Sequence, residues 1–154
     1  MVRGGRFSAQ SRNEVGEKML SHKLQRAFEE THYTVHHQPA FTLRIGQHSP
    51  ELDALLQASG HDCAAFITAC NPQGQRLDAS DNRQRQQNLL DELDARDLTT
   101  LPGSGQHPDN GWPAEESVLV LGLQFQAARA LARSFGQLAF VWADRHQVAE
   151  LIEV

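Results

Sequence analysis

The sequence predicts an α+β fold built on a mixed β-sheet with helices on both faces. Two short runs, 63–69 and 117–123, are apolar at nearly every position, as in strands that are covered on both faces. From residue 63 onward the patterns follow the order strand, helix, strand, strand, helix, strand, which is typical of a ferredoxin-like core. We therefore expect such a core over about 63–143, with these two runs as parallel central strands and a short strand at 98–101 on an edge.

The part of the chain before residue 63 supplies two helices and two strands. Apolar residues at helical spacing predict a short helix that ends near Thr31. Alternating patterns predict strands over 33–37 and 41–45. Ser49, followed by proline and an acid, is a good helix N-cap, and Gly60 is a natural C-cap for the same helix.

After the first central strand, Ser80 is the expected cap of a helix that reaches about Arg96. Stepping along its inner face places Asn82 beside the turn that follows the central strand. The stretch 102–113 is rich in glycine and proline, and loops of this length are usually functional or disordered. The remaining elements are a helix over 124–135, a strand over 137–143 and an edge strand over 148–154.

Charge divides the 154 residues into a basic start and an acidic body. Residues 1–26 carry a net charge of +4 and the remainder −9. We expect residues 1–18 to be a disordered basic leader and 19–154 to form a single α+β domain, with Met1 or Met19 as the true start. The acidic body repels phosphate backbones, so nucleic acid is not an expected partner. No apolar run is long enough to span a bilayer, so no membrane association is expected.

The two cysteines, Cys63 and Cys70, lie in the same predicted strand, roughly 23 Å apart, which is too far for a disulfide. Buried free thiols and the lack of a secretory signal favour a cytoplasmic protein. The histidines are scattered and the standard nucleotide, hydrolase and zinc motifs are absent, so no metal site is expected and no cofactor is identified.

Three amides form the first group of candidate site residues. Asn71 follows the first central strand, Asn82 lies at a helix start, and Gln137 begins the last core strand. In the ferredoxin-like order all three meet at one end of the sheet. Amides orient ligands and rarely transfer protons, and a helix start attracts anions, so this group predicts a site for a small polar or anionic, nucleotide-like ligand. The alternative is that the amides only brace the turn.

A second group lies where the long loop enters the strand at 117. Trp112 precedes two acids, Glu115 and Glu116, which point to opposite faces of that strand. A carboxylate near a tryptophan can act as a general base if burial raises its pKa. With parallel central strands this group starts at the end of the sheet opposite to Asn71. The two groups then form one site only if the long loop folds across.

At these residues the chain resembles a bacterial family of unknown function, domain of unknown function 3293 (DUF 3293). The resemblance covers roughly residues 30–154 and rests on the segments 67–72, Asn82, 112–117 and 135–137, in that order and spacing. It implies no established activity, so it adds weight to the candidate residues without supplying a mechanism.

Three functional hypotheses follow. The first is a domain that binds a small polar or anionic ligand at the Asn71 turn, with Asn82, Trp112 and Gln137. The second is a hydrolase-type enzyme that uses Glu115 or Glu116 as general base, which a pocket joining Asn71 to Glu115 would favour. The third is a protein-interaction module that uses the long loop and the basic leader, which an exposed apolar patch around Trp112 would favour.

Overall fold

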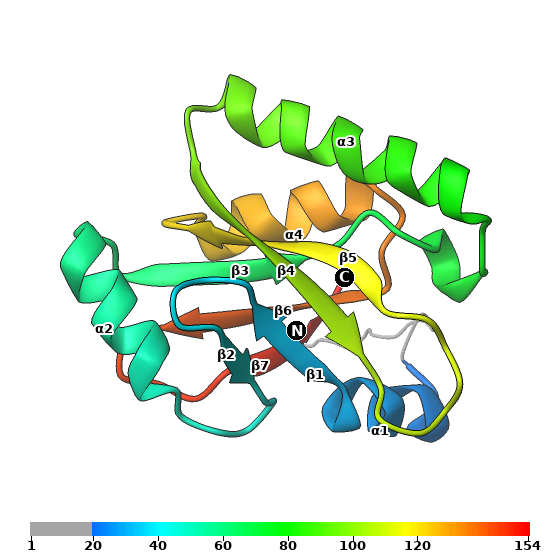
Figure 1. The fold of residues 1–154 in the computed structure, drawn as a ribbon, viewed down its shortest axis with the longest axis horizontal. Helices are drawn as coiled ribbons and strands as arrows, with labels where there is room; N and C mark the ends of the chain where they lie inside the picture. The colour runs from blue at the N-terminus through cyan, green and yellow to red at the C-terminus, as the bar shows by residue number, and fades with distance from the viewer. Residues whose placement is uncertain (1–19) are drawn as a thin grey trace, which may run out of the picture.

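The computed structural model describes residues 20–154, so the leader expected at 1–18 lies outside the described residues. Four α-helices, one short 3-10 turn and seven strands follow one another along this part of the chain (Figure 1). They are α1 (His22–Glu30), β1 (His32–Val35), β2 (Phe41–Leu43), α2 (Pro50–Ser59), β3 (Cys63–Ile67), η1 (Pro72–Gly74), α3 (Ala79–Ala95), β4 (Thr99–Gln106), β5 (Glu115–Leu121), α4 (Phe125–Ser134), β6 (Ala139–Asp144) and β7 (Glu150–Glu153).

The α+β class is confirmed, but the sheet is not mixed. The seven strands form one sheet in the order β2-β1-β4-β5-β3-β6-β7, and every neighbouring pair is antiparallel. The apolar runs are indeed central neighbours as β3 and β5, yet the prediction that they are parallel is wrong. An apolar pattern reports that both faces are covered and carries no information on strand direction. The ferredoxin-like core stays a prediction, because these strands belong to a larger, curled antiparallel sheet.

The sheet curls until its two edges meet. Ile45, just after β2, forms a bridge with Ala149, just before β7, and His48 bridges Val148. The Gly46 amide donates to the Ala149 carbonyl at 2.8 Å. These contacts satisfy backbone groups that would otherwise be exposed on both edge strands.

Each face of the curled sheet has its own apolar core. The inner face, toward which the sheet curls, carries Phe66 and Leu119 and is covered at one end by Leu52 and Leu56 of α2. The outer face is covered by α3 and α4, whose buried leucines pack against alternate residues of β3 and β5. Figure 1 shows α3 and α4 above the sheet, α2 at the left and α1 at the lower right. The prediction of helices on both faces is confirmed.

Strand β4 extends to Gln106 and so takes up the first part of the stretch 102–113, which we expected to be a loop. It pairs with both β1 and β5, so it is not an edge strand. Pro102 lies one residue beyond the last pair of the β1–β4 ladder, where its missing N–H costs little. At Gly103 a Cβ atom would lie 2.7 Å from the Phe66 ring and 2.8 Å from the Thr34 carbonyl oxygen. The glycine therefore permits close packing instead of ending the strand.

Two of the three predicted helix caps, Ser49 and Gly60, are confirmed, and the third, Ser80, is wrong. Helix α2 has Ser49 as N-cap, whose hydroxyl accepts from the Leu52 amide, and Gly60 as a left-handed C-cap. Helix α3 starts earlier than expected, because Asp78 and not Ser80 is the N-cap. None of the helices in residues 20–154 is long and apolar enough to cross a membrane.

Candidate functional site

The turn after β3 is built around the side chain of Asn71, which is 6% exposed. Its backbone is left-handed, with φ of 50°, a region that asparagine tolerates better than most residues. Its Oδ1 accepts from the Leu77 amide at 2.8 Å and from Asn82 Nδ2 at 2.9 Å. Asn82 Oδ1 in return accepts from the Asn71 amide at 2.9 Å. The two asparagines therefore lock the turn to the first part of α3, as their positions in the sequence indicated.

Glu115 lies at the same turn. Asn71 Nδ2 donates to Glu115 Oε2 at 2.6 Å, so the two predicted groups of residues form one cluster. The expectation that they start at opposite ends of the sheet is wrong, because it assumed parallel strands. In an antiparallel pair the first residues of β5 lie beside the last residues of β3, and Ile67 indeed pairs with Val118.

The two acids differ sharply in environment. Burial raises the pKa of the Glu115 carboxyl, and the hydrogen bond from Asn71 only partly offsets that effect. Glu116 points to the other face of β5 and is exposed, while its backbone carbonyl accepts from the Thr68 hydroxyl at 2.7 Å. Of the two candidates for general base, Glu115 alone has a buried carboxyl beside the amide cluster.

Gln137 joins the cluster from the segment between α4 and β6. Its Nε2 donates to the Cys70 carbonyl at 3.0 Å and to the Phe135 carbonyl at 3.4 Å. Arg85 of α3 reinforces the same junction, since its guanidinium donates to the carbonyls of Ala69 and Phe135. The ends of β3, α3 and α4 are thus joined by side-chain donors on backbone acceptors.

A cavity of about 610 Å³ adjoins this cluster. It lies between the inner face of the sheet and the apolar stripe of α1, formed by Leu24, Ala27 and Phe28, which are only half-buried. Apolar side chains make up much of its wall, and the polar side chains of Asn71, Glu115 and Gln137 also line it. Aromatic, aliphatic and small residues contribute the rest: Tyr33, Phe66, Cys70, Ser117, Phe140, Val141 and Leu151 among others.

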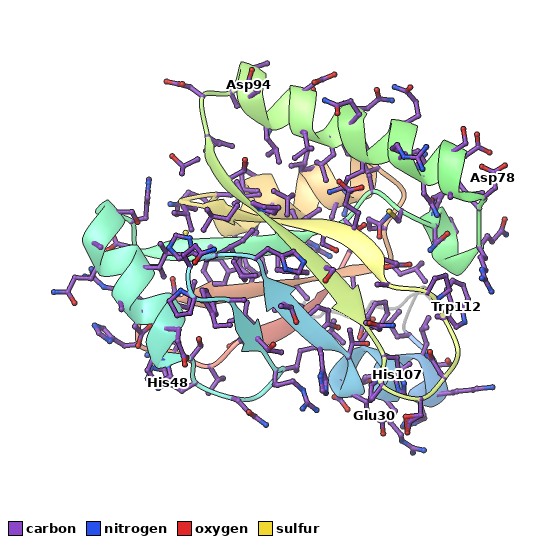
Figure 2. The ribbon with its side chains drawn as sticks, viewed as in Figure 1. Glu30, His48, Asp78, Asp94, His107 and Trp112 are labelled. Carbon is purple, nitrogen blue, oxygen red and sulfur yellow. The ribbon has the colours of Figure 1, made fainter. Side chains whose placement is uncertain are left out.

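The loop between β4 and β5 forms another part of the cavity wall. Trp112 on this loop is 37% exposed, and the Arg76 guanidinium carbon lies 5.8 Å from its ring centre. His107 at the start of the loop is paired with Glu30 of α1 at 2.8 Å, and its other ring nitrogen accepts from the Asp109 and Asn110 amides. Figure 2 shows His107 beside Glu30, with Trp112 further along the loop. The loop and α1 are therefore tied together beside the cavity.

A second, surface hollow of about 470 Å³ lies beside the β6–β7 turn. Its lining includes Asp62, Asp144, Arg145 and Glu150 but none of the residues that the sequence singled out. Within residues 20–154, no group of three or more histidine, cysteine or acidic side chains is arranged to hold a metal ion.

The sequence identified the polar residues of the cluster but not the apolar cavity. The helix at α1 was predicted, but not that its apolar stripe lines a cavity. No sequence signal marks the cavity: only the structure shows that α1 contains no fully buried residue despite its apolar side chains. Tyr33 and Phe66, which stack edge to face with ring centres 5.5 Å apart, were also not foreseen as cavity walls.

Comparison with known proteins adds a family and no activity. Residues 67–140 match the model of a family described as "Protein of unknown function (DUF3293)", which confirms the resemblance over that segment. The segment contains all of the candidate site residues. No curated protein matches the chain. No solved structure matches it.

Proposed function

We propose that this chain, whose residues 67–140 match the DUF3293 family, binds a small ligand in the cavity under α1. The observation that carries the proposal is a cavity of about 610 Å³ whose largely apolar wall includes the Asn71–Glu115–Gln137 cluster. Small-molecule sites are typically of this size, with apolar walls and a few placed polar groups. In this proposal the ligand's polar end meets the cluster and its apolar part contacts α1 and the inner face of the sheet.

The geometry supports a polar ligand better than an anionic, nucleotide-like one. The buried ionisable group of the cluster is a carboxyl, Glu115, and a phosphate placed there would face it directly. Lys23, the one lysine or arginine that lines the cavity within the described residues, is exposed. Like charges at short range in a site of low dielectric are strongly unfavourable.

A ligand screen with matched variants tests the binding proposal. The Ala27→Trp variant fills the cavity from α1, and Arg26→Trp places the same side chain on the exposed face of that helix. We expect some members of a panel of polar, apolar, anionic and nucleotide compounds to raise the melting temperature of the wild type and of Arg26→Trp, but not that of Ala27→Trp. A ligand at 100 times its Kd stabilises by about 2.7 kcal/mol, which is about 8 °C for a chain of this length. A panel in which no compound separates Ala27→Trp from the other two proteins contradicts the proposal.

The second candidate is a hydrolase-type enzyme in which Glu115 acts as general base. It is favoured by the sharing of one cavity by Asn71 and Glu115, and by the raised pKa of that carboxyl, which brings it closer to the range useful for proton transfer. Cys70 also lines the cavity, but burial raises the pKa of its thiol, which disfavours a cysteine nucleophile. Turnover of a ligand found in the screen, lost in Glu115→Gln with binding retained, would support this candidate.

The protein-interaction hypothesis has less support, because Trp112, although 37% exposed, lines the cavity and lies against Arg76. For location, we propose the cytoplasm. Cys63 and Cys70 are both buried and free, and such thiols are typical of reducing compartments.

A further inference from the structure

We infer that the ligand of this cavity carries a positively charged hydrogen-bond donor, such as an amidinium or amine, on a flat apolar body. The inference rests on the proposed function and names the chemical class of the ligand. Its basis is the set of polar atoms nearest Glu115: most of the donors there are used within the protein, whereas two acceptor oxygens, on Glu115 and Gln137, have no partner among the described residues.

Asn71 has both lone pairs of its amide oxygen and one of its two side-chain N–H donors committed. Its Oδ1 already accepts two hydrogen bonds, from the Leu77 amide and from Asn82, and its Nδ2 donates to Glu115. An amide oxygen has two lone pairs, so Asn71 has no acceptor capacity left for a ligand. Its role is to hold Glu115 in place.

Glu115 and Gln137 each have an oxygen to spare. Glu115 Oε2 accepts from Asn71, and Oε1 has no partner among the described residues. Gln137 donates from Nε2 to two carbonyls, which can only accept, so its amide orientation is fixed. Its Oε1 likewise has no partner within residues 20–154. Both residues line the cavity, so the cluster presents two acceptor oxygens, one of them on a carboxyl group.

Four of the five hydroxyl groups that line the wall donate within the described residues; Thr31 donates to the Ala27 carbonyl, and Ser21 is the exception. Thr68 donates to the Glu116 carbonyl at 2.7 Å, Ser117 to the Glu115 carbonyl at 3.0 Å, and Tyr33 to the Phe28 carbonyl at 2.6 Å. Burial also raises the pKa of the Tyr33 phenol, so it remains a donor at neutral pH. The lining side-chain donors without a partner in the described part of the chain are the second N–H of Asn71 Nδ2 and groups on four exposed residues: Ser21, Lys23, Asn110 and Trp112.

A cationic donor suits this arrangement for two reasons. An N–H of an amidinium or ammonium group bonded to Glu115 Oε1 would form a charge-assisted hydrogen bond, and a second N–H could serve Gln137 Oε1. The positive charge would also compensate a carboxylate that burial destabilises. The apolar body would meet aromatic side chains, with Tyr33 and Phe66 arranged edge to face and Phe28 on the opposing helix.

Three probes of almost the same shape test the charge preference: benzamidine, which is a cation, benzamide, which is neutral, and benzoate, which is an anion. Binding of each is measured by isothermal titration calorimetry to the wild type, Glu115→Gln and Glu116→Gln. Glu116→Gln makes the same charge change one residue away, on the exposed side of the strand. We expect the wild type to bind benzamidine at least tenfold more tightly than benzamide and to reject benzoate. Glu115→Gln should lose at least tenfold in benzamidine affinity, and Glu116→Gln should stay within twofold.

The pH dependence gives a readout that a loss of folding cannot imitate. A bound cation lowers the pKa of Glu115, so benzamidine affinity for the wild type should fall as the pH is lowered and Glu115 takes up a proton. Affinity for Glu115→Gln should be flat over the same range. Benzoate binding as tight as benzamidine binding, or benzamidine binding that Glu115→Gln leaves unchanged, would overturn the inference, as would the lack of any benzamidine binding. The proposed function survives that outcome if a screened compound still distinguishes Ala27→Trp from Arg26→Trp, and fails with it if none does.

Discussion

Replacement of Asn71 by alanine should be among the most destabilising single changes at the site. The substitution removes three side-chain hydrogen bonds, to the Leu77 amide, to Asn82 and to Glu115. At a net value of about 1 kcal/mol each, these bonds contribute about 3 kcal/mol. Alanine also tolerates the left-handed backbone less well, at a cost of about 1 kcal/mol. The expected loss is about 4 kcal/mol.

The assay is urea denaturation, with thermal melting in parallel. For a chain of this length the loss corresponds to a fall in melting temperature of about 12 °C. Asn88→Ala is the matched control, because Asn88 is exposed on the same helix that carries Asn82 and bonds only to Gln84, one turn away. It should change stability by less than about 0.5 kcal/mol. An Asn71→Ala variant as stable as Asn88→Ala would refute the view that Asn71 organises the turn.

Asn71→Asp probes the contact with Glu115 directly. The new carboxyl retains the acceptor for Leu77 but replaces the donor that lies 2.6 Å from Glu115 Oε2. Two carboxylates at that distance must share a proton, so the pair's folded-state pKa rises above its unfolded value. Stability should therefore be greatest at acidic pH, below the unfolded pKa, and decline as the pH rises through the folded one. A variant whose stability is independent of pH between about 4 and 8 would show that the two side chains do not meet.

Three further outcomes are expected. Burial raises the pKa of Glu115, so the contribution of this residue to stability is present at acidic pH and lost as the pH rises. In denaturant titrations Glu115→Gln should therefore be as stable as the wild type at low pH and more stable than the wild type at neutral pH. A variant less stable than the wild type at neutral pH would contradict this. Gly103→Ala should lower the free energy of unfolding by about 1–3 kcal/mol, because the added Cβ meets ring and carbonyl atoms of neighbouring strands. Gly105→Ala is the control and should be nearly neutral, because the nearest atoms to its added Cβ lie at 3.7 Å. Equal stabilities of the two variants would refute the packing argument. Cys63 and Cys70 are buried, so both should react slowly with a thiol reagent in the native state. A cavity ligand should slow the reaction of Cys70, which lines the cavity, and leave that of Cys63 unchanged. Equal protection of both thiols would place the ligand elsewhere.

Much of the local structure could be predicted because its signals are local. The apolar run at 63–69 predicted a buried strand, and β3 spans Cys63–Ile67. The Ser49 and Gly60 caps bounded α2 because each cap acts on backbone groups within one turn of helix. The approach of Asn82 to Asn71 also followed from position, since Asn71 lies in the turn after a strand and Asn82 in the first turn of the next helix.

Strand direction and its consequences could not be predicted in the same way. Whether β5 runs with or against β3 depends on how the connections pack, and both directions bury the same apolar residues. The error placed Glu115 at the wrong end of the sheet, although the residue itself had been singled out. The predicted range of β4 was too short for a related reason. Whether Gly103 ends a strand or makes room for the Phe66 ring is decided by residues distant in sequence.

The cavity is a further property that pattern analysis cannot supply. A helical stripe such as that of α1 predicts burial against something, but not that a space of about 610 Å³ remains beneath it. The free oxygens of Glu115 and Gln137 are equally invisible in sequence, because they are defined by which hydrogen bonds the other atoms of each side chain have already made.

The most direct test of the account is a nuclear magnetic resonance titration with benzamidine that follows side-chain amide and indole signals. The account predicts that the side-chain amides of Asn71 and Gln137 and the indole of Trp112 shift together along one binding curve. The side-chain amides of Gln84 and Gln87, exposed on α3, should not move. Shifts that spare Asn71 and Gln137, or that gather at the surface hollow beside the β6–β7 turn, would contradict a ligand site in the cavity under α1.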